Sequence, residues 1–280
     1  MHLRVDFRRL SSLRNVGAVP VLVIIGGGNM GAALVEGALH AGRSPGEIIV
    51  VEAREDRCRE LTHMFPGVEV TESIPACGDV IVAVKPSQVA EVCTAAVARG
   101  ASRIMSIAAG VRLAALQQAS GETVRVVRAM PNTPALVGMS ATAVCVSANC
   151  DAADRSWARQ LMEGMGIVVE LDESMLDAFT GLIGSGPAYV FYLAESLYHA
   201  ARAEGFDSVT SATLVSQLIA GSAALLQREP DGAERLRLRV TSPNGTTAAG
   251  VAQLEMHGVR DAIIKAVRAA TARSKELGDA

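Results

Sequence analysis

The sequence has 280 residues, half of them hydrophobic but only 3% aromatic, and a formal net charge of −3. This length suits one large domain or two of ordinary size, and the hydrophobic content excludes a disordered chain. The weakly acidic balance argues against a nucleic-acid binder, whose domain is normally basic. The cysteines are odd in number and scattered, and the histidines show no ligand spacing. We therefore expect free thiols, a cytoplasmic location and no metal site. No apolar run reaches the length needed to span a bilayer, so we expect no membrane partner.

Residues 1–20 form an arginine-rich N-terminal extension without a sustained apolar core. They therefore do not resemble a secretory signal. Three interpretations remain open: an organelle transit peptide, a disordered arm, or a start site placed too early.

A strand, a glycine turn and a helix follow in order. Residues 21–25 are apolar and mostly β-branched, as expected for a buried parallel strand, and a helix then continues to about Leu39. Between them, Gly26, Gly28 and Gly31 have the G-x-G-x-x-G spacing. In that motif the first glycine permits a tight turn, the second admits a pyrophosphate and the third allows close packing. The context favours a dinucleotide site, although a plain glycine-rich turn has the same composition.

A second strand at residues 47–51 ends in Glu52. An acidic residue about twenty positions after such glycines binds the ribose 2′-hydroxyl of NAD, whereas an arginine accommodates the 2′-phosphate of NADP. Glu52 therefore argues for NADH, while Arg54 and Arg57 could serve NADPH. A solvated cluster of charges is the alternative.

The pattern then predicts six more strands and one helix between the last two. The strands are expected at residues 68–70, 79–84, 103–107, 123–127, 141–146 and 167–171, and the helix at 151–165. We expect Pro86 to end the fourth strand, because proline donates no ladder hydrogen bond. After the sixth strand, Pro131 and Pro134 restrain an extended segment that presents Asn132.

From about Asp172 the apolar residues fall at helical spacing, and no further alternating strand is predicted. We therefore expect an α/β nucleotide domain at residues 21–171 and an all-helical domain at 172–280. Such a small helical domain, with alanine-rich faces, often gains burial by pairing with a second copy.

Near the C-terminus, residues 241–247 read Thr-Ser-Pro-Asn-Gly-Thr-Thr and precede a helix. Hydroxyl groups, a proline turn and a glycine before a helix form a possible anion-binding nest. An ordinary helix cap has the same composition.

Taken together, these segments resemble the Δ1-pyrroline-5-carboxylate reductase family. The matching segments occur in the family's order, and they are Gly26–Gly31, Ala83–Pro86, Ser106–Gly110, Arg128–Ala135, Gly184–Tyr189 and Thr241–Thr247. The resemblance implies a Rossmann-like N-terminal domain with an all-α C-terminal dimerisation domain. It also implies hydride transfer from NADPH or NADH to the C=N bond of 1-pyrroline-5-carboxylate, giving L-proline, in at least a homodimer.

The resemblance assigns roles to individual residues. The implied cofactor-binding residues are Gly26, Gly27, Gly28, Asn29, Met30, Gly31, Glu52, Ala83, Val84, Lys85, Pro86, Ala108, Ala109, Gly110 and Asn132. The implied substrate-binding residues are Glu173, Ser242, Asn244, Gly245, Thr246 and Thr247. Thr247 is the implied catalytic residue, because it matches a threonine that hydrogen-bonds the ring nitrogen. A helix-start glutamate is the alternative interpretation of Glu173.

Several positions depart from the family pattern. Asn244 replaces a glycine of the nest, residues 136–140 are about two residues short, Leu238 replaces an acidic residue, and Thr71-Glu72 stands where an asparagine is common. If position 244 needs a positive φ, asparagine is among the few residues that tolerate it. These departures leave two alternatives open: a reductase of another small cyclic imine or keto acid, and a nucleotide-binding homologue with impaired catalysis.

Overall fold

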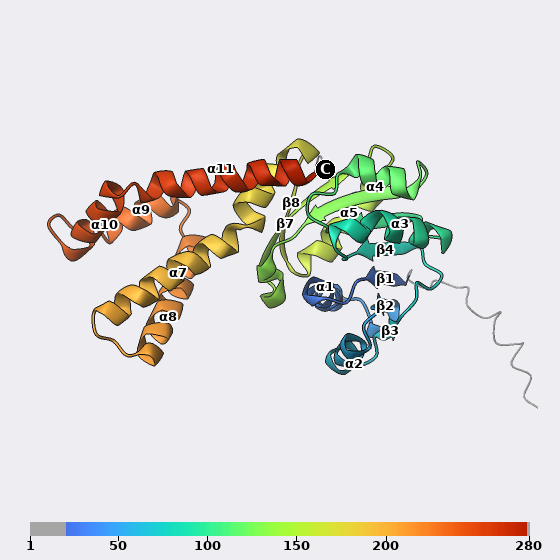
Figure 1. The fold of residues 1–280 in the computed structure, drawn as a ribbon, viewed down its shortest axis with the longest axis horizontal. Helices are drawn as coiled ribbons and strands as arrows, with labels where there is room; N and C mark the ends of the chain where they lie inside the picture. Colours follow the sequence, from blue (N-terminus) through green and yellow to red (C-terminus); the bar gives the residue numbers. More distant parts are fainter. Residues whose placement is uncertain (1–20, 279–280) are drawn as a thin grey trace, which may run out of the picture. The chain divides into compact units, whose positions relative to one another are not determined.

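A computed structural model describes residues 21–278, and it divides the chain into two compact units with the boundary between Glu173 and Ser174. Figure 1 shows the sheet in the first unit and the long helices of the second. The expectations for residues 1–20 lie outside the described residues. Each unit is described separately below.

The first unit is built on an eight-stranded sheet in the order β3-β2-β1-β4-β5-β6-β7-β8. The strands are β1 (Leu22–Ile25), β2 (Ile48–Val51), β3 (Glu69–Thr71), β4 (Asp79–Val82), β5 (Arg103–Ser106), β6 (Arg125–Met130), β7 (Ser140–Val146) and β8 (Gly166–Glu170). All neighbouring pairs are parallel except β6 and β7, which are antiparallel. The Rossmann-like α/β class expected from the sequence is confirmed.

Helices cover both faces of this sheet, as a parallel sheet requires. The helices of this unit are α1 (Asn29–His40), α2 (Glu55–Met64), α3 (Val89–Ala98), α4 (Leu113–Ser120) and α5 (Ala152–Glu163). Alternate residues of β1 serve opposite faces: Leu22 and Ile24 pack with α1, α2 and α5, whereas Val23 and Ile25 pack with α3 and α4. This explains why the strand is apolar at every position.

Each predicted strand differs from the structure by one to three residues at one or both ends, and three of these differences have a clear cause. Glu47 belongs to a 3₁₀ turn (Pro45–Glu47) that Pro45 begins, so β2 starts one residue later. The fourth strand ends at Val82, and Pro86 begins a separate 3₁₀ turn (Pro86–Gln88) instead of terminating the strand. The sixth strand is shifted towards the C-terminus, because β6 continues pairing with β7 as far as Met130.

The second unit is helical throughout its described residues. After a 3₁₀ turn at the boundary (Glu173–Met175), its elements are α6 (Leu176–Phe179), a π-helical turn (Thr180–Gly184), α7 (Gly186–Ala203), α8 (Ser208–Arg228), α9 (Gly232–Arg239), α10 (Thr246–Met256) and α11 (Val259–Gly278). Gly181 allows α11 to approach closely, because a β-carbon there would lie 2.3 Å from Thr271 Oγ1. The buried Ser274 hydroxyl donates to Asp177 Oδ1 at 2.7 Å across the same contact.

Helix α8 is long and apolar enough to cross a membrane by length and composition alone, with a mean hydropathy of 1.5. This corrects the expectation that no apolar stretch reaches such a length. Serine, threonine and glutamine interrupt the run, so the feature becomes visible only when hydropathy is averaged along the helix. Only 11% of the apolar window is buried within one chain, so most of it is exposed.

Candidate functional site

The glycine turn joins β1 to α1, and its glycines occupy different environments. Gly26 has φ +108°, and a β-carbon on it would lie 2.4 Å from the Ala83 carbonyl oxygen. Gly31 is equally confined, because its β-carbon would lie 2.0 Å from the Gly26 oxygen. A β-carbon on Gly28 would instead meet nothing within 4 Å. The turn is therefore tight at its first and last glycines and open at the middle one, as a pyrophosphate cradle requires.

The predicted nucleotide residues that follow β4 contact this turn. The Ala83 N–H donates to the Ile25 carbonyl at 2.8 Å, and Val84 Cγ1 lies 3.1 Å from the β-carbon position of Gly26. Lys85 and Pro86 are exposed beyond them. The structure thus brings Ala83 and Val84 to the glycines and leaves the next two side chains in solvent.

Glu52 is also built into the turn. Its Oε2 accepts a hydrogen bond from the Gly27 N–H at 3.2 Å. Gly27 itself has no room for a side chain, since its β-carbon would lie 2.5 Å from Leu61 Cδ1. Asn29 and Met30 begin α1, with Asn29 exposed and Met30 packed against the core.

The segment Ala108-Ala109-Gly110 follows β5, the strand that pairs with β4. Ala108 and Gly110 are buried, Ala109 is exposed, and Gly110 adopts φ +78°. Since β4 and β5 are parallel, their carboxyl ends share one edge of the sheet with the glycine turn.

The Asn132 side chain is hydrogen-bonded to the beginning of β7. Its side-chain oxygen accepts hydrogen bonds from the Ser140 hydroxyl and the Ala141 N–H, both at 3.1 Å. The amide therefore ties the segment after β6 to the start of β7. Its assignment as a cofactor ligand remains a prediction.

Glu173 lies in the first unit and is engaged there. Its Oε1 accepts from Arg128 Nη1 at 2.8 Å and from the Leu113 N–H, at the start of α4, at 2.7 Å. Arg128 is 2% exposed and Glu173 is 28% exposed, so this ion pair is partly buried. Burial, followed by the negative charge of Glu173, raises the pKa of the nearby Cys145 thiol to about 12. Arg128 was not predicted as the partner of Glu173; it is the buried one of the two arginines in β6, and a buried charge in a largely apolar strand is a usable signal.

The other predicted substrate residues lie in the second unit, at the N-terminus of α10. Gly245 is the N-cap, its N–H donates to the Ser242 carbonyl at 3.1 Å, and no side chain caps the helix. Asn244 has φ +60°, the only positive φ of a non-glycine residue in the described part of the chain. Ser242, Asn244 and Thr246 are exposed, and Thr247 is half-buried. The first N–H groups of a helix lack intrahelical partners, so this end can bind an anion.

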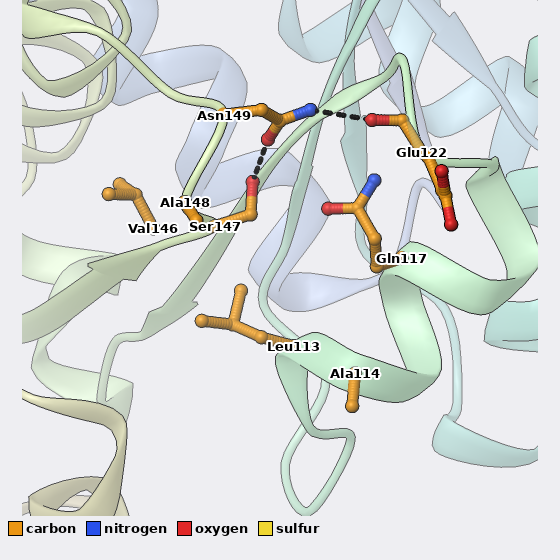
Figure 2. A pocket seen from close by; sticks show the side chains of 8 residues that line it. All are labelled: Leu113, Ala114, Gln117, Glu122, Val146, Ser147, Ala148 and Asn149. Atoms are coloured by element: carbon orange, nitrogen blue, oxygen red, sulfur yellow. Dashed lines mark hydrogen bonds between the residues drawn. The ribbon is translucent and has the colours of Figure 1, made fainter.

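A separate hollow of about 400 Å³ lies beside α4, and it contains none of the predicted site residues. Its lining residues, drawn in Figure 2, are Leu113, Ala114, Gln117, Glu122, Val146, Ser147, Ala148 and Asn149. Asn149 bridges it by accepting from the Ser147 hydroxyl and donating to the Glu122 carbonyl. These polar groups are hydrogen-bonded to one another, so we do not assign the hollow as a ligand site.

Comparison with protein families divides the chain in a similar way. Residues 173–277 match the model described as pyrroline-5-carboxylate reductase dimerisation, and residues 21–110 match the model described as NADP oxidoreductase, coenzyme F420-dependent. The second match ends at Gly110, in the segment after β5.

Individual relatives match over most of their length. Pyrroline-5-carboxylate reductases from Synechocystis sp. and Corynebacterium melassecola are 38% and 34% identical, and each alignment covers 92% of this chain and 98% of the relative.

Two solved structures give the same result. A pyrroline-5-carboxylate reductase from Coxiella burnetii has a TM-score of 0.84 at 32% identity, and a Plasmodium falciparum pyrroline carboxylate reductase with NADP bound has 0.82 at 28%. Each comparison covers 92% of this chain and 98% of the other. On this evidence the chain belongs to the pyrroline-5-carboxylate reductase family.

Proposed function

We propose that this protein reduces 1-pyrroline-5-carboxylate to L-proline with NADH or NADPH as the hydride donor, the last step of proline biosynthesis. The observation that carries the proposal is the glycine turn: it is crowded at Gly26 and Gly31 and open at Gly28, in a chain that matches such reductases almost end to end. A nicotinamide nucleotide supplies hydride when bound. The residues of this chain need to bind the nucleotide and the substrate, orient them, and exclude water from the site.

The nucleotide would be held by the first unit. Gly26 to Gly31, with the N-terminus of α1, offer N–H groups and a partial positive charge to the pyrophosphate. Ala83 and Val84 flank the turn, and the small residues Ala108 to Gly110 leave space for a flat ring at the same sheet edge. Asn132 supports that edge through Ser140.

The substrate would be held by the second unit. Its carboxylate suits the free N–H groups at the start of α10 and the hydroxyls of Ser242 and Thr246. A β-carbon on Gly245 would lie 2.5 Å from Ser242 Oγ, so a larger residue there would displace the Ser242 hydroxyl. Thr247, half-buried on the first turn of α10, would hydrogen-bond the ring nitrogen and orient the C=N bond.

No acid–base residue is required beyond this. A protonated imine already accepts hydride at carbon, and the nitrogen keeps its proton in the product. Glu173 would act indirectly, as a positioning residue. Its carboxylate accepts hydrogen bonds from Arg128 and from the Leu113 N–H, and it therefore fixes the start of α4.

The second unit would also mediate self-association as a homodimer or larger homo-oligomer. Its long helices expose large apolar side chains, including Phe191 and Tyr192 on α7 at 67% and 73%. Burial of such surface by a second copy would explain the apolar character of α8 without a membrane. All five cysteines are free, which suits the reducing cytoplasm.

The experiment is the oxidation of NADH and NADPH by purified protein with 1-pyrroline-5-carboxylate, and product identification by mass spectrometry. We expect L-proline in amounts equal to the nucleotide oxidised. A faster reaction with pyruvate or a six-membered cyclic imine would favour the alternative reductase, and no turnover with any substrate would indicate an impaired homologue.

A further inference from the structure

The carboxylate at the end of β2 is fixed in position. Glu52 Oε2 accepts from the Gly27 N–H at 3.2 Å, and Oε1 accepts from the Arg54 N–H at 3.0 Å. The side chain is only 11% exposed. Moving it away would leave the half-buried Gly27 N–H without its partner.

The two neighbouring arginines, Arg54 and Arg57, both contact other groups of the protein. Arg57 Nε donates to the Gly27 carbonyl at 2.7 Å, its Nη1 pairs with Glu60 at 2.7 Å, and the side chain is 13% exposed. It braces the glycine turn from behind, with its strongest donors already used. Arg54 is 62% exposed, and its Nε lies 3.4 Å from Glu52 Oε1, so that carboxylate balances part of its charge.

Several further carboxylates lie close to Glu52. Glu55 and Asp56 form the first turn of α2, and Glu72 follows β3, the strand paired with β2. The pKa of the Cys58 thiol is raised, first by burial and then by the negative charges of Glu52, Glu72 and Asp56. The region beyond β2 is therefore negative, with its cations already paired.

We infer that the nucleotide site selects NADH over NADPH, with Glu52 as the specificity-determining residue. Its carboxylate can accept from a ribose 2′-hydroxyl while keeping both backbone donors, because each oxygen has a second lone pair. A 2′-phosphate would instead face a fixed, half-buried like charge, and the exposed Arg54 guanidinium beside it already contacts Glu52. The inference rests on the proposed function only in requiring that a nicotinamide nucleotide binds.

The test is nucleotide binding, measured by calorimetry on the purified full-length protein without substrate. We expect NADH to bind at least about tenfold more tightly than NADPH. ADP-ribose and its 2′-phosphorylated form should show the same order, because the discrimination lies at the adenosine end. Equal affinity, or tighter binding of NADPH, would overturn the inference.

Two variants separate the charge of Glu52 from its shape. Glu52→Gln keeps an acceptor for the backbone but removes the charge, and should shift the NADH:NADPH affinity ratio towards NADPH by about tenfold. Glu36→Gln removes the same charge from an exposed position on α1 and should leave the ratio unchanged. An unchanged ratio in folded Glu52→Gln would remove the role of Glu52. If that variant does not fold, the wild-type ratios of both nucleotide pairs still decide the inference.

The same titrations distinguish this inference from the proposed function. If neither nucleotide binds at millimolar concentration, the proposed function fails as well. If NADPH binds more tightly and supports proline formation, the proposed function stands and only the inferred selectivity is wrong.

Discussion

The carbonyl oxygen of Gly26 lies 2.0 Å from the position that a β-carbon would occupy on Gly31. The first turn of α1 is therefore pressed against the beginning of the glycine loop, and neither residue can be enlarged without moving the backbone. Gly28, between them, faces open space. This contrast separates the glycines that build the turn from the one that leaves room for a ligand.

The contrast predicts two kinds of glycine variant. Gly31→Ala should lower the free energy of unfolding by several kcal/mol, because its methyl group would overlap backbone atoms. Gly28→Ala should unfold close to wild type but weaken NADH binding by about tenfold or more. Thermal unfolding and calorimetric titration of both variants measure these effects. Unchanged NADH affinity in Gly28→Ala would contradict the proposed pyrophosphate position.

Thr247 carries the proposed orientation of the substrate nitrogen. Thr247→Ala should reduce kcat/KM for 1-pyrroline-5-carboxylate by about 10- to 100-fold, whereas Thr247→Ser should retain most of it, since one hydrogen bond contributes about 1.5–3 kcal/mol when a charged group is involved. Thr213→Ala is the matched control, because that exposed threonine bonds only to its own helix. Equal kcat/KM in Thr247→Ala and wild type would exclude the role.

Asn244 tests the geometry of the turn before α10. Its φ of +60° costs about 1–2 kcal/mol for a residue with an ordinary side chain. Asn244→Gly should therefore match or exceed the wild-type melting temperature, and Asn244→Ala should fall below it. The reverse order would show that the asparagine side chain, and not the backbone conformation, stabilises the turn.

The ion pair of buried Arg128 with half-buried Glu173 should be costly to break from one side. Arg128→Met should lower the free energy of unfolding by about 2–3 kcal/mol, because it leaves the Glu173 carboxylate, which is 28% exposed, without its charged partner. The double variant Arg128→Met with Glu173→Gln should recover part of that loss in urea titrations. Additive losses would mean that the two side chains do not stabilise each other.

Cys145 links stability to pH. Its pKa is about 12 in the folded state against 9.0 unperturbed, so unfolding favours the thiolate. The stabilisation is therefore complete below pH 9 and is lost progressively as the pH rises towards 12. At pH 10 the loss should be about 1.4 kcal/mol relative to pH 8. Urea unfolding of wild type and Cys145→Ala at both pH values isolates this term, and parallel losses in the two proteins would contradict it.

Much of the fold could be predicted from the sequence because each strand carries its own signal. The continuous apolar run of residues 21–25, followed by glycines, is typical of a buried strand that ends in a turn. The α/β class, which the structure confirms, follows from this pattern. The errors concern strand ends. Whether β6 stops at Val127 or continues to Met130 depends on its pairing with the antiparallel strand β7, which the residues of β6 do not encode by themselves.

Site residues were harder to predict, because their partners come from other elements. Arg57 donates a hydrogen bond to the Gly27 carbonyl, and this contact depends on how α2 packs beside the turn. That Glu173 is held by Arg128 depends on the meeting of β6 with a residue far along the chain. Neither contact leaves a local pattern, whereas the positive φ at Asn244 was foreseeable from the tolerance of asparagine for that conformation.

The most direct measurement of the central claim follows the hydride itself. The protein should be incubated with 1-pyrroline-5-carboxylate and NADH carrying deuterium at both C4 positions, and the product should be examined by mass spectrometry and NMR. The account predicts L-proline with one deuterium at C5, the former imine carbon. The incubation is repeated with NADPH labelled in the same way, and absence of proline with both nucleotides, or proline without that deuterium, would contradict the account.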